Sequence, residues 1–134
     1  MTDIAARLQE VRARIARAEQ AADRTPGGVR LLAVSKLQPA AAVRVAHAAG
    51  QAAFGENYVQ EGLGKMAELA DLALEWHLIG PLQSNKTREV AEHFDWVQSV
   101  DREKIARRLG EQRPASLPPL QVCLQVNIDD EASK

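Results

Sequence analysis

The apolar positions near the N-terminus recur every three or four residues. They are Ile4, Leu8, Val11, Ile15, Ala18 and Ala22, and charged residues occupy the positions between them. This spacing predicts an amphipathic helix with one apolar face. Residues 25–28 (TPGG) then end the helix, because proline cannot continue the hydrogen-bond ladder and glycine admits turn geometries closed to other residues.

After this break, short apolar runs alternate with helix-like segments. The predicted strands are residues 29–35, 51–54, 74–79, 96–99 and 120–128. The predicted helices lie between Pro39 and Gly50 and over residues 59–72, 85–93 and 102–109, and residues 113–119 form a proline-rich loop. The alternation is typical of βα units rather than of a helix bundle or a β-sandwich. Five such units fit either an open doubly wound sheet or the first part of an eight-stranded barrel, and periodicity does not choose between them.

Composition narrows the possible partners. The 134 residues fit one domain, and 17 basic against 18 acidic residues give a net charge of −1 without a basic stripe for nucleic acid. Cys123 is the only cysteine, which excludes an intrachain disulfide, and we expect it to be a buried structural thiol. No apolar run is long enough for a signal core or a membrane span, so we expect a cytoplasmic protein. Neither a metal-ligand spacing nor a glycine-rich phosphate loop follows any predicted strand.

Lys36 is the first candidate for chemistry. It follows the apolar residues 31–35 (LLAVS), which places its amine at the carboxyl edge of a predicted buried strand. That edge is where βα folds place their active sites. A desolvated lysine loses its proton more readily, and the neutral amine attacks an aldehyde to form a Schiff base. The alternative is a lysine whose stem packs along the strand end while its ammonium reaches water.

Two further polar segments directly follow predicted strands. Residues 54–58 read FGENY, in which Asn57 both donates and accepts hydrogen bonds and Tyr58 offers a flat ring with a hydroxyl. These groups suit a heteroaromatic ligand, and a turn followed by an Asn-capped helix explains them equally well. Residues 76–86 read WHLIGPLQSNK. In this segment His77 lies between two apolar residues, a position more typical of a hydrogen-bonded core histidine than of a proton shuttle.

Together these segments match one known family in order and spacing. The matching segments are residues 32–36 (LAVSK), 54–61 (FGENYVQE), 76–86 (WHLIGPLQSNK), 99–102 (SVDR) and 125–129 (QVNID). The chain resembles the pyridoxal phosphate homeostasis proteins from its first helix to its last residue.

The resemblance implies a fold, a cofactor and three site residues. It implies an α/β fold of the (β/α)8 TIM-barrel type, similar to the N-terminal domain of alanine racemase, with residues 1–134 forming one incomplete domain of about five βα units after an N-terminal helix. Lys36 would hold pyridoxal 5'-phosphate as a Schiff base, Asn57 would contact the pyridine ring, and His77 would belong to the pocket wall. Members are regarded as carriers that buffer the cofactor or deliver it to apo-enzymes, and not as enzymes.

The end of the chain departs from the family pattern. Chains of this family continue past residue 134 with further strands and with a serine- and glycine-rich loop that holds the phosphate. We therefore expect a truncated barrel whose strand edges and apolar faces remain unpaired. Lys86 and Lys134 are expected to face solvent.

Other functions remain open at this point. A racemase-like enzyme would also use Lys36, although racemisation needs an acid or base on each face of the substrate. A fragment without cofactor would act through association of its apolar edges, and a lysine-dependent aldolase would form an imine with a sugar-like carbonyl compound.

Overall fold

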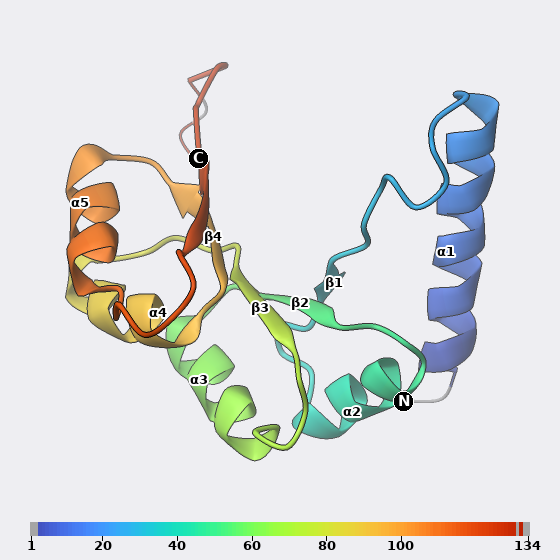
Figure 1. Ribbon diagram of the computed structural model, residues 1–134, viewed down its shortest axis with the longest axis horizontal. Coiled ribbons are helices and arrows are strands. Elements are labelled where there is room, and N and C mark those ends of the chain that lie inside the picture. The colour runs from blue at the N-terminus through green and yellow to red at the C-terminus, as the bar shows by residue number, and fades with distance from the viewer. Residues whose placement is uncertain (1–2, 131, 133–134) are drawn as a thin grey trace.

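The computed structural model describes residues 3–130 and 132, so Lys134 lies outside the described residues. It contains a five-stranded sheet and its connecting helices (Figure 1). In chain order the elements are α1 Ile4–Ala21, β1 Ala33–Val34, α2 Ala40–Ala48, β2 Ala53–Glu56, α3 Val59–Glu68, β3 Glu75–Leu78, the 3-10 helix η1 Ser84–Lys86, α4 Thr87–His93, β4 Trp96–Val100, α5 Glu103–Gln112 and β5 Gln121–Leu124.

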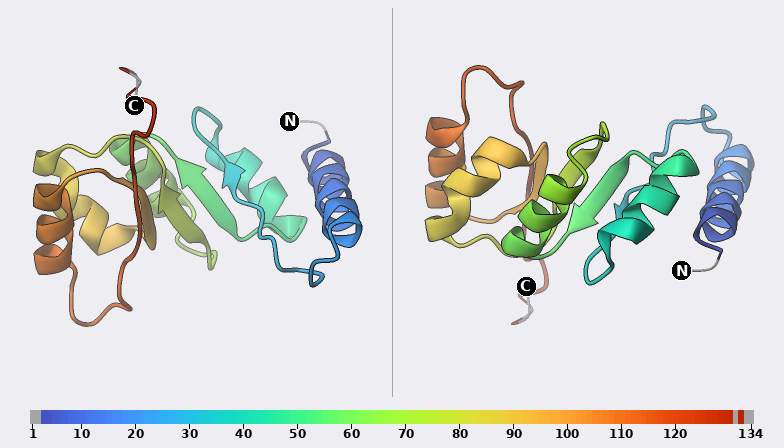
Figure 2. Two further views of the ribbon diagram at one scale, coloured as in Figure 1. Left: turned by 90° about the horizontal axis from the view of Figure 1, so that it is seen from above. Right: turned by 90° about the horizontal axis from the view of Figure 1, so that it is seen from below.

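The order of the strands decides between the two architectures that periodicity left open. All neighbouring strands are parallel, and their order in the sheet is β1-β2-β3-β4-β5, the same as in the sequence. Helices α2, α3, α4 and α5 lie on one side of the curved sheet (Figures 1 and 2). A doubly wound sheet would reverse its strand order and carry helices on both faces. The predicted incomplete barrel is therefore confirmed, with a sheet that is not closed.

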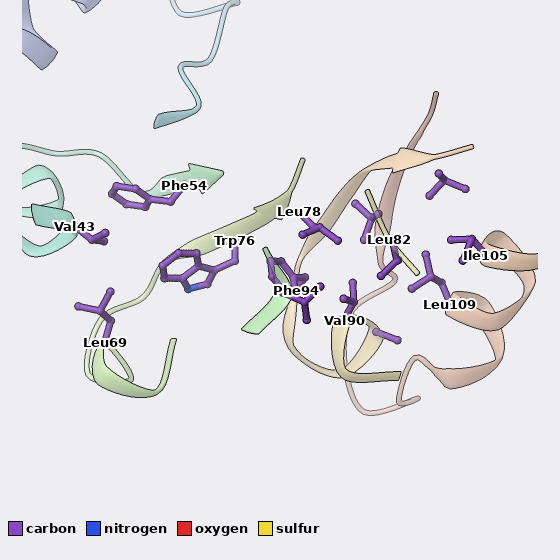
Figure 3. Close-up of a cluster of buried hydrophobic side chains, with 14 of the residues drawn as sticks. Val43, Phe54, Leu69, Trp76, Leu78, Leu82, Val90, Phe94, Ile105 and Leu109 are labelled. Carbon is purple, nitrogen blue, oxygen red and sulfur yellow. The ribbon is translucent and has the colours of Figure 1, made fainter. Parts of the chain in front are cut away.

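The hydrophobic core lies between the sheet and these helices (Figure 3). Phe54, Trp76 and Leu78 point from β2 and β3 into this layer, and the rings of Phe54 and Trp76 are 6.0 Å apart. Phe94 and Ile105 cover the layer from the α4 and α5 segments, and both are fully buried. Because side chains alternate along a strand, the intervening residues of each strand point to the opposite, inner face.

The two strands at the sheet edges are shorter than predicted. β1 covers only Ala33–Val34 of the predicted residues 29–35, and β5 covers only Gln121–Leu124 of the predicted residues 120–128. Each of these strands has a neighbour on one side only, so part of the apolar run forms no ladder. All residues of β5 are exposed, and the prediction that Cys123 is buried is therefore wrong.

The bounds of two helices also differ from the predicted ones. The helix predicted over residues 59–72 ends at Glu68, and the one predicted over residues 85–93 is divided into the 3-10 turn η1 and α4. In the part of the chain that the structure describes, none of the helices combines the length and the apolar character needed to cross a bilayer.

Candidate functional site

The parallel strands bring their carboxyl ends to one rim of the sheet. Val34 of β1 lies opposite Gly55 of β2, so Lys36 and Asn57, each two residues further on, follow the strands at the same level. Lys36 is exposed in the turn after β1, and Asn57 is half-buried directly after β2. The rim therefore holds two of the three predicted site residues on neighbouring strands.

The turn that carries Lys36 has an unusual backbone. Leu37 adopts a φ of 61°, in the left-handed region that costs a residue with a side chain about 1–2 kcal/mol. The N–H of Leu37 donates a hydrogen bond of 2.6 Å to Glu61 Oε2 of α3. The Leu37 side chain is 75% exposed, so packing of that side chain does not account for the conformation.

A buried ion cluster lies directly beneath this turn. Lys65 Nζ of α3 contacts Glu56 Oε2 at 2.9 Å and Glu61 Oε2 at 2.8 Å, and it donates a hydrogen bond to the carbonyl oxygen of Ser35. The Ser35 hydroxyl donates to the same oxygen of Glu56. The Lys65 and Glu56 side chains are 8% and 0% exposed. All three ammonium protons of Lys65 thus have an acceptor, which is what makes a buried charge tolerable.

The cluster also perturbs Glu61. The hydrogen bond from Lys65 lowers the pKa of Glu61 below its ordinary value, and the N–H of Leu37 acts in the same direction. Glu61 therefore stays an anion, which accepts stronger hydrogen bonds than a neutral acid.

Asn57 contributes an acceptor that the fold does not use. Its Oδ1 atom is buried and has no hydrogen-bond partner within the part of the chain that the structure describes. Asn57 also lines a hollow of about 350 Å³ at the rim, together with Tyr58, Pro81 and Lys86. Lys86 is 35% exposed, so it reaches solvent as predicted, and it also lines this hollow and lies 3.7 Å from Glu89.

The rim segments after β2 and β3 are in backbone contact at Gly80. A Cβ atom on Gly80 would lie 2.2 Å from the carbonyl oxygen of Asn57. The hydroxyl of Ser99 in β4 donates a hydrogen bond of 2.6 Å to the carbonyl oxygen of Gly80. Residue 80 therefore has to be glycine for three neighbouring strands to meet at this rim.

We expect Gly80→Ala to destabilise the chain by at least about 2 kcal/mol, because the added methyl group collides with a backbone atom that cannot move without shifting Asn57. Urea unfolding followed by circular dichroism measures the change. Gly64→Ala is the matched control, since a Cβ at exposed Gly64 of α3 meets nothing within 4 Å. Alanine should stabilise that helix by about 0.5–1 kcal/mol. Equal midpoints for Gly80→Ala and the unmodified chain would contradict the contact.

His77 lies on the inner face, below the rim. It pairs opposite Gly55 in the sheet and is therefore nearer the amino ends of the strands than Asn57. Its Nε2 atom is 2.7 Å from Glu75 Oε1, and the amide of Gln98 lies 2.9 Å from Nδ1. The ring stacks on Trp96 with centroids 5.2 Å apart and planes 5° apart. This pattern fits the tautomer in which Nε2–H donates to the carboxylate and Nδ1 accepts from the amide.

The contacts of Glu75 predict a pH dependence. The hydrogen bond from His77, and then that from Arg30, lower the pKa of Glu75 below its ordinary value of 4.5. A carboxyl group with a lowered folded pKa stabilises the fold above its unfolded pKa, and that contribution is lost as the pH falls through the folded value. The free energy of unfolding should therefore differ between the native chain and Glu75→Gln by up to about 1 kcal/mol at pH 7, and the difference should shrink below pH 4.5. A difference that stays constant from pH 7 to pH 3.5 would rule out this linkage.

The sequence reasoning did not find the charged cluster under the Lys36 turn. Glu56 lies two residues after Phe54 in one strand, so strand alternation places both side chains on the helix-covered face. Lys65 follows Gly62 and Val59 at helical spacing, and all three are buried. A carboxylate and an ammonium at buried positions of adjoining elements are the signal that would have revealed the pair.

Among residues 3–130 and 132, no group of three or more histidine, cysteine, aspartate or glutamate side chains could hold a metal ion. The fold and the rim together define a class: a one-sided parallel α/β sheet of the barrel type with an exposed lysine at the carboxyl end of its first strand.

A family model described as "Alanine racemase, N-terminal domain" matches residues 6–131. The chain belongs to this family.

Several known proteins are similar to the chain. The pyridoxal phosphate homeostasis protein of Pseudomonas aeruginosa is 69% identical over 134 residues, which are all of this chain and 58% of that protein. The protein of the same name from Escherichia coli K12 is 56% identical over 137 residues, which again include all of this chain and 58% of that protein. The chain thus spans little more than half the length of these curated relatives.

Solved structures agree with the fold. PipY of Synechococcus elongatus, in a structure with PLP bound, is 55% identical with a TM-score of 0.64, over 72% of this chain and 46% of PipY. A protein from Bifidobacterium adolescentis, described only as unknown, is 34% identical with a TM-score of 0.73, over 82% of this chain and 49% of that protein. The curated relatives named above carry the name of a homeostasis protein and not the name of a reaction.

Proposed function

We propose that this chain is part of a protein that binds pyridoxal 5'-phosphate, and that Lys36 is the residue that binds it covalently. The single observation that carries the proposal is the exposed amine of Lys36 at the carboxyl end of β1, level with the unpartnered Oδ1 atom of Asn57. The names of the relatives and the PLP-bound structure of PipY support the same cofactor.

The residues present suit this cofactor. When bound, it would supply an aldehyde carbon that Nζ of Lys36 could bind covalently, with the carbonyl oxygen lost as water. Lys36 is exposed, so its side chain is accessible to an aldehyde that enters from solvent. The Oδ1 atom of Asn57 accepts a hydrogen bond from a donor that enters the rim.

We assign His77 to the wall of the site. Both ring nitrogens are already engaged by Glu75 and Gln98, and the ring is stacked on Trp96. A ring held in this way does not transfer a proton readily, but it forms a rigid surface on the inner face below the rim.

The proposed role of the whole protein is to carry or buffer the cofactor in the cytoplasm and to release it to apo-enzymes. Racemisation needs an acid or base on each face of the substrate carbon. Lys36 would supply one such group, and the relatives named above carry no name of a reaction. An assay of amino-acid racemisation by the cofactor-loaded chain separates the two functions, because turnover that depends on Lys36 would overturn the carrier role.

The direct test is trapping with borohydride followed by peptide mapping. The chain is mixed with pyridoxal 5'-phosphate, reduced, digested and analysed by mass spectrometry. We expect the adduct on the peptide that contains Lys36. Lys104 of α5 is exposed and follows β4, which β2 and β3 separate from β1 in the sheet, so it reports nonspecific reaction better than the half-buried Lys86. An adduct found mainly on Lys104, with Lys36 unmodified, would overturn the proposal.

A further inference from the structure

The backbone on both sides of Lys36 is held by two side chains of one helix. The carbonyl oxygen of Ser35, in the peptide before Lys36, accepts a hydrogen bond of 2.5 Å from Lys65 Nζ. The N–H of Leu37, in the peptide after Lys36, donates one of 2.6 Å to Glu61 Oε2. Glu61 and Lys65 lie one turn apart on α3, with 2.8 Å between their charged groups. Both peptide groups of Lys36 are thus fixed to α3.

The backbone conformation of Leu37 depends on the hydrogen bond from its N–H to Glu61. Its φ of 61° is disfavoured for a residue with a side chain and persists only where neighbouring contacts impose it. The side chain of Leu37 is largely exposed, and the carboxylate of Glu61 is the group that holds its N–H. A charge-assisted hydrogen bond of this kind is about twice as strong as a neutral one.

The two holding residues differ in what else they do. Lys65 also compensates the fully buried carboxylate of Glu56, so its removal leaves an unpaired charge in the core. Glu61 is 24% exposed, and without it Lys65 still contacts Glu56 and the Ser35 carbonyl oxygen. Glu61 can therefore be removed without leaving a buried charge unpaired.

We propose that Glu61 is a positioning residue for Lys36: by holding the N–H of Leu37, it maintains the left-handed turn that presents the Lys36 amine at the rim. This inference rests on the proposed function, in which Lys36 is the residue that binds the cofactor. The contacts of Glu61 are with the N–H of Leu37 and with Lys65, so it acts through the backbone of the turn.

The test compares the rate of borohydride-trapped modification at Lys36 with that at Lys104 in the same sample. Pyridoxal 5'-phosphate is the probe. Glu61→Ala should lower the ratio of the two rates about tenfold, which is the effect of losing one hydrogen bond to a charged group. Glu61→Gln should restore most of the ratio, because its amide oxygen can still accept from Leu37. Glu68→Ala is the matched control, since Glu68 is an exposed carboxylate near the end of the same helix.

A second variant tests whether Glu61 acts through the conformation of Leu37. Leu37→Gly removes the cost of the left-handed φ, so in this background the turn should no longer depend on the hydrogen bond to Glu61. We expect Glu61→Ala combined with Leu37→Gly to keep about the rate ratio of Leu37→Gly alone. A loss in this background as large as that of Glu61→Ala in the native chain would overturn a role that acts through the conformation of Leu37. If Glu61→Ala alone does not fold, the double variant, which lacks the strained turn, carries the test.

The outcomes are distinct for the two proposals. An unchanged ratio in folded Glu61→Ala overturns the positioning role and leaves the role of Lys36 intact. A Glu61→Gln chain as slow as Glu61→Ala contradicts the importance of the acceptor oxygen. Absence of modification at Lys36 in the native chain overturns the proposed function, and the positioning role with it.

Discussion

Replacing Lys36 with alanine is expected to abolish the visible absorption band that the chain develops with pyridoxal 5'-phosphate. The band requires a carbon–nitrogen double bond, and alanine has no amine to form it. Lys36 is the lysine that follows β1 at the carboxyl rim, whereas Lys65 is buried and has all its protons engaged with acceptors. Borohydride-fixed cofactor should therefore fall to the level of nonspecific reaction. Absorbance spectra and intact mass before and after reduction measure both effects.

The controls for this experiment are two further substitutions. Lys104→Ala removes an exposed lysine that follows β4 rather than β1 and should leave the band unchanged. Lys36→Arg keeps the positive charge but offers no reactive amine at accessible pH, so it should behave like Lys36→Ala. A band of undiminished height in Lys36→Ala would show that another lysine forms the imine.

The second large effect is expected in the core. Lys65→Met should lower the free energy of unfolding by about 3–5 kcal/mol, because it leaves the carboxylate of Glu56 buried without its counter-charge. Glu56 is already short of partners, since its Oε1 atom accepts no hydrogen bond from the described residues. Urea unfolding followed by circular dichroism measures the loss. Lys104→Met, the same substitution at an exposed position, should change stability by less than about 0.5 kcal/mol.

A double substitution tests whether the loss comes from the unpaired charge. Glu56→Gln combined with Lys65→Met removes both charges while keeping similar side-chain volumes. Neutral replacements of a buried ion pair are often close to neutral for stability, so the double variant should regain most of what Lys65→Met loses. If the double variant loses as much stability as Glu56→Gln alone and Lys65→Met alone added together, Glu56 and Lys65 are not energetically coupled.

Much of the fold could be predicted from local patterns. The amphipathic spacing of the first segment predicted α1 almost to its ends, and Pro39 and Gly50 bracketed α2 correctly. Such signals act over a few residues, through backbone geometry and burial of one face, so they survive in any tertiary context. The family resemblance then supplied the barrel architecture, which periodicity alone could not distinguish from a doubly wound sheet.

Strand lengths at the edges were not predictable in the same way. An apolar alternating run continues through residues 120–128, but only Gln121–Leu124 forms a strand. Val126 and Ile128 are 72% and 86% exposed. A strand needs a neighbour as well as a pattern, and the neighbour is set by tertiary structure.

The sequence by itself determined the chemistry that the rim can offer. Placing Lys36 and Asn57 directly after apolar runs was enough to expect an amine and an amide at the same edge of a parallel sheet. The sequence also set the family, through motifs whose order and spacing are specific only when taken together.

Only the tertiary structure decided what holds the Lys36 turn in place. The contacts of Lys65 with Glu56 and with the carbonyl oxygen of Ser35 join residues that are 9 and 30 positions apart. The left-handed Leu37 is stabilised by Glu61, 24 residues later in the chain. The local backbone preference of a leucine opposes this conformation, and a charged residue at position 56 or 65 would be predicted to lie on the surface. The contacts become favourable only when β1, β2 and α3 are packed together, because burial strengthens each interaction and makes every unpaired group costly.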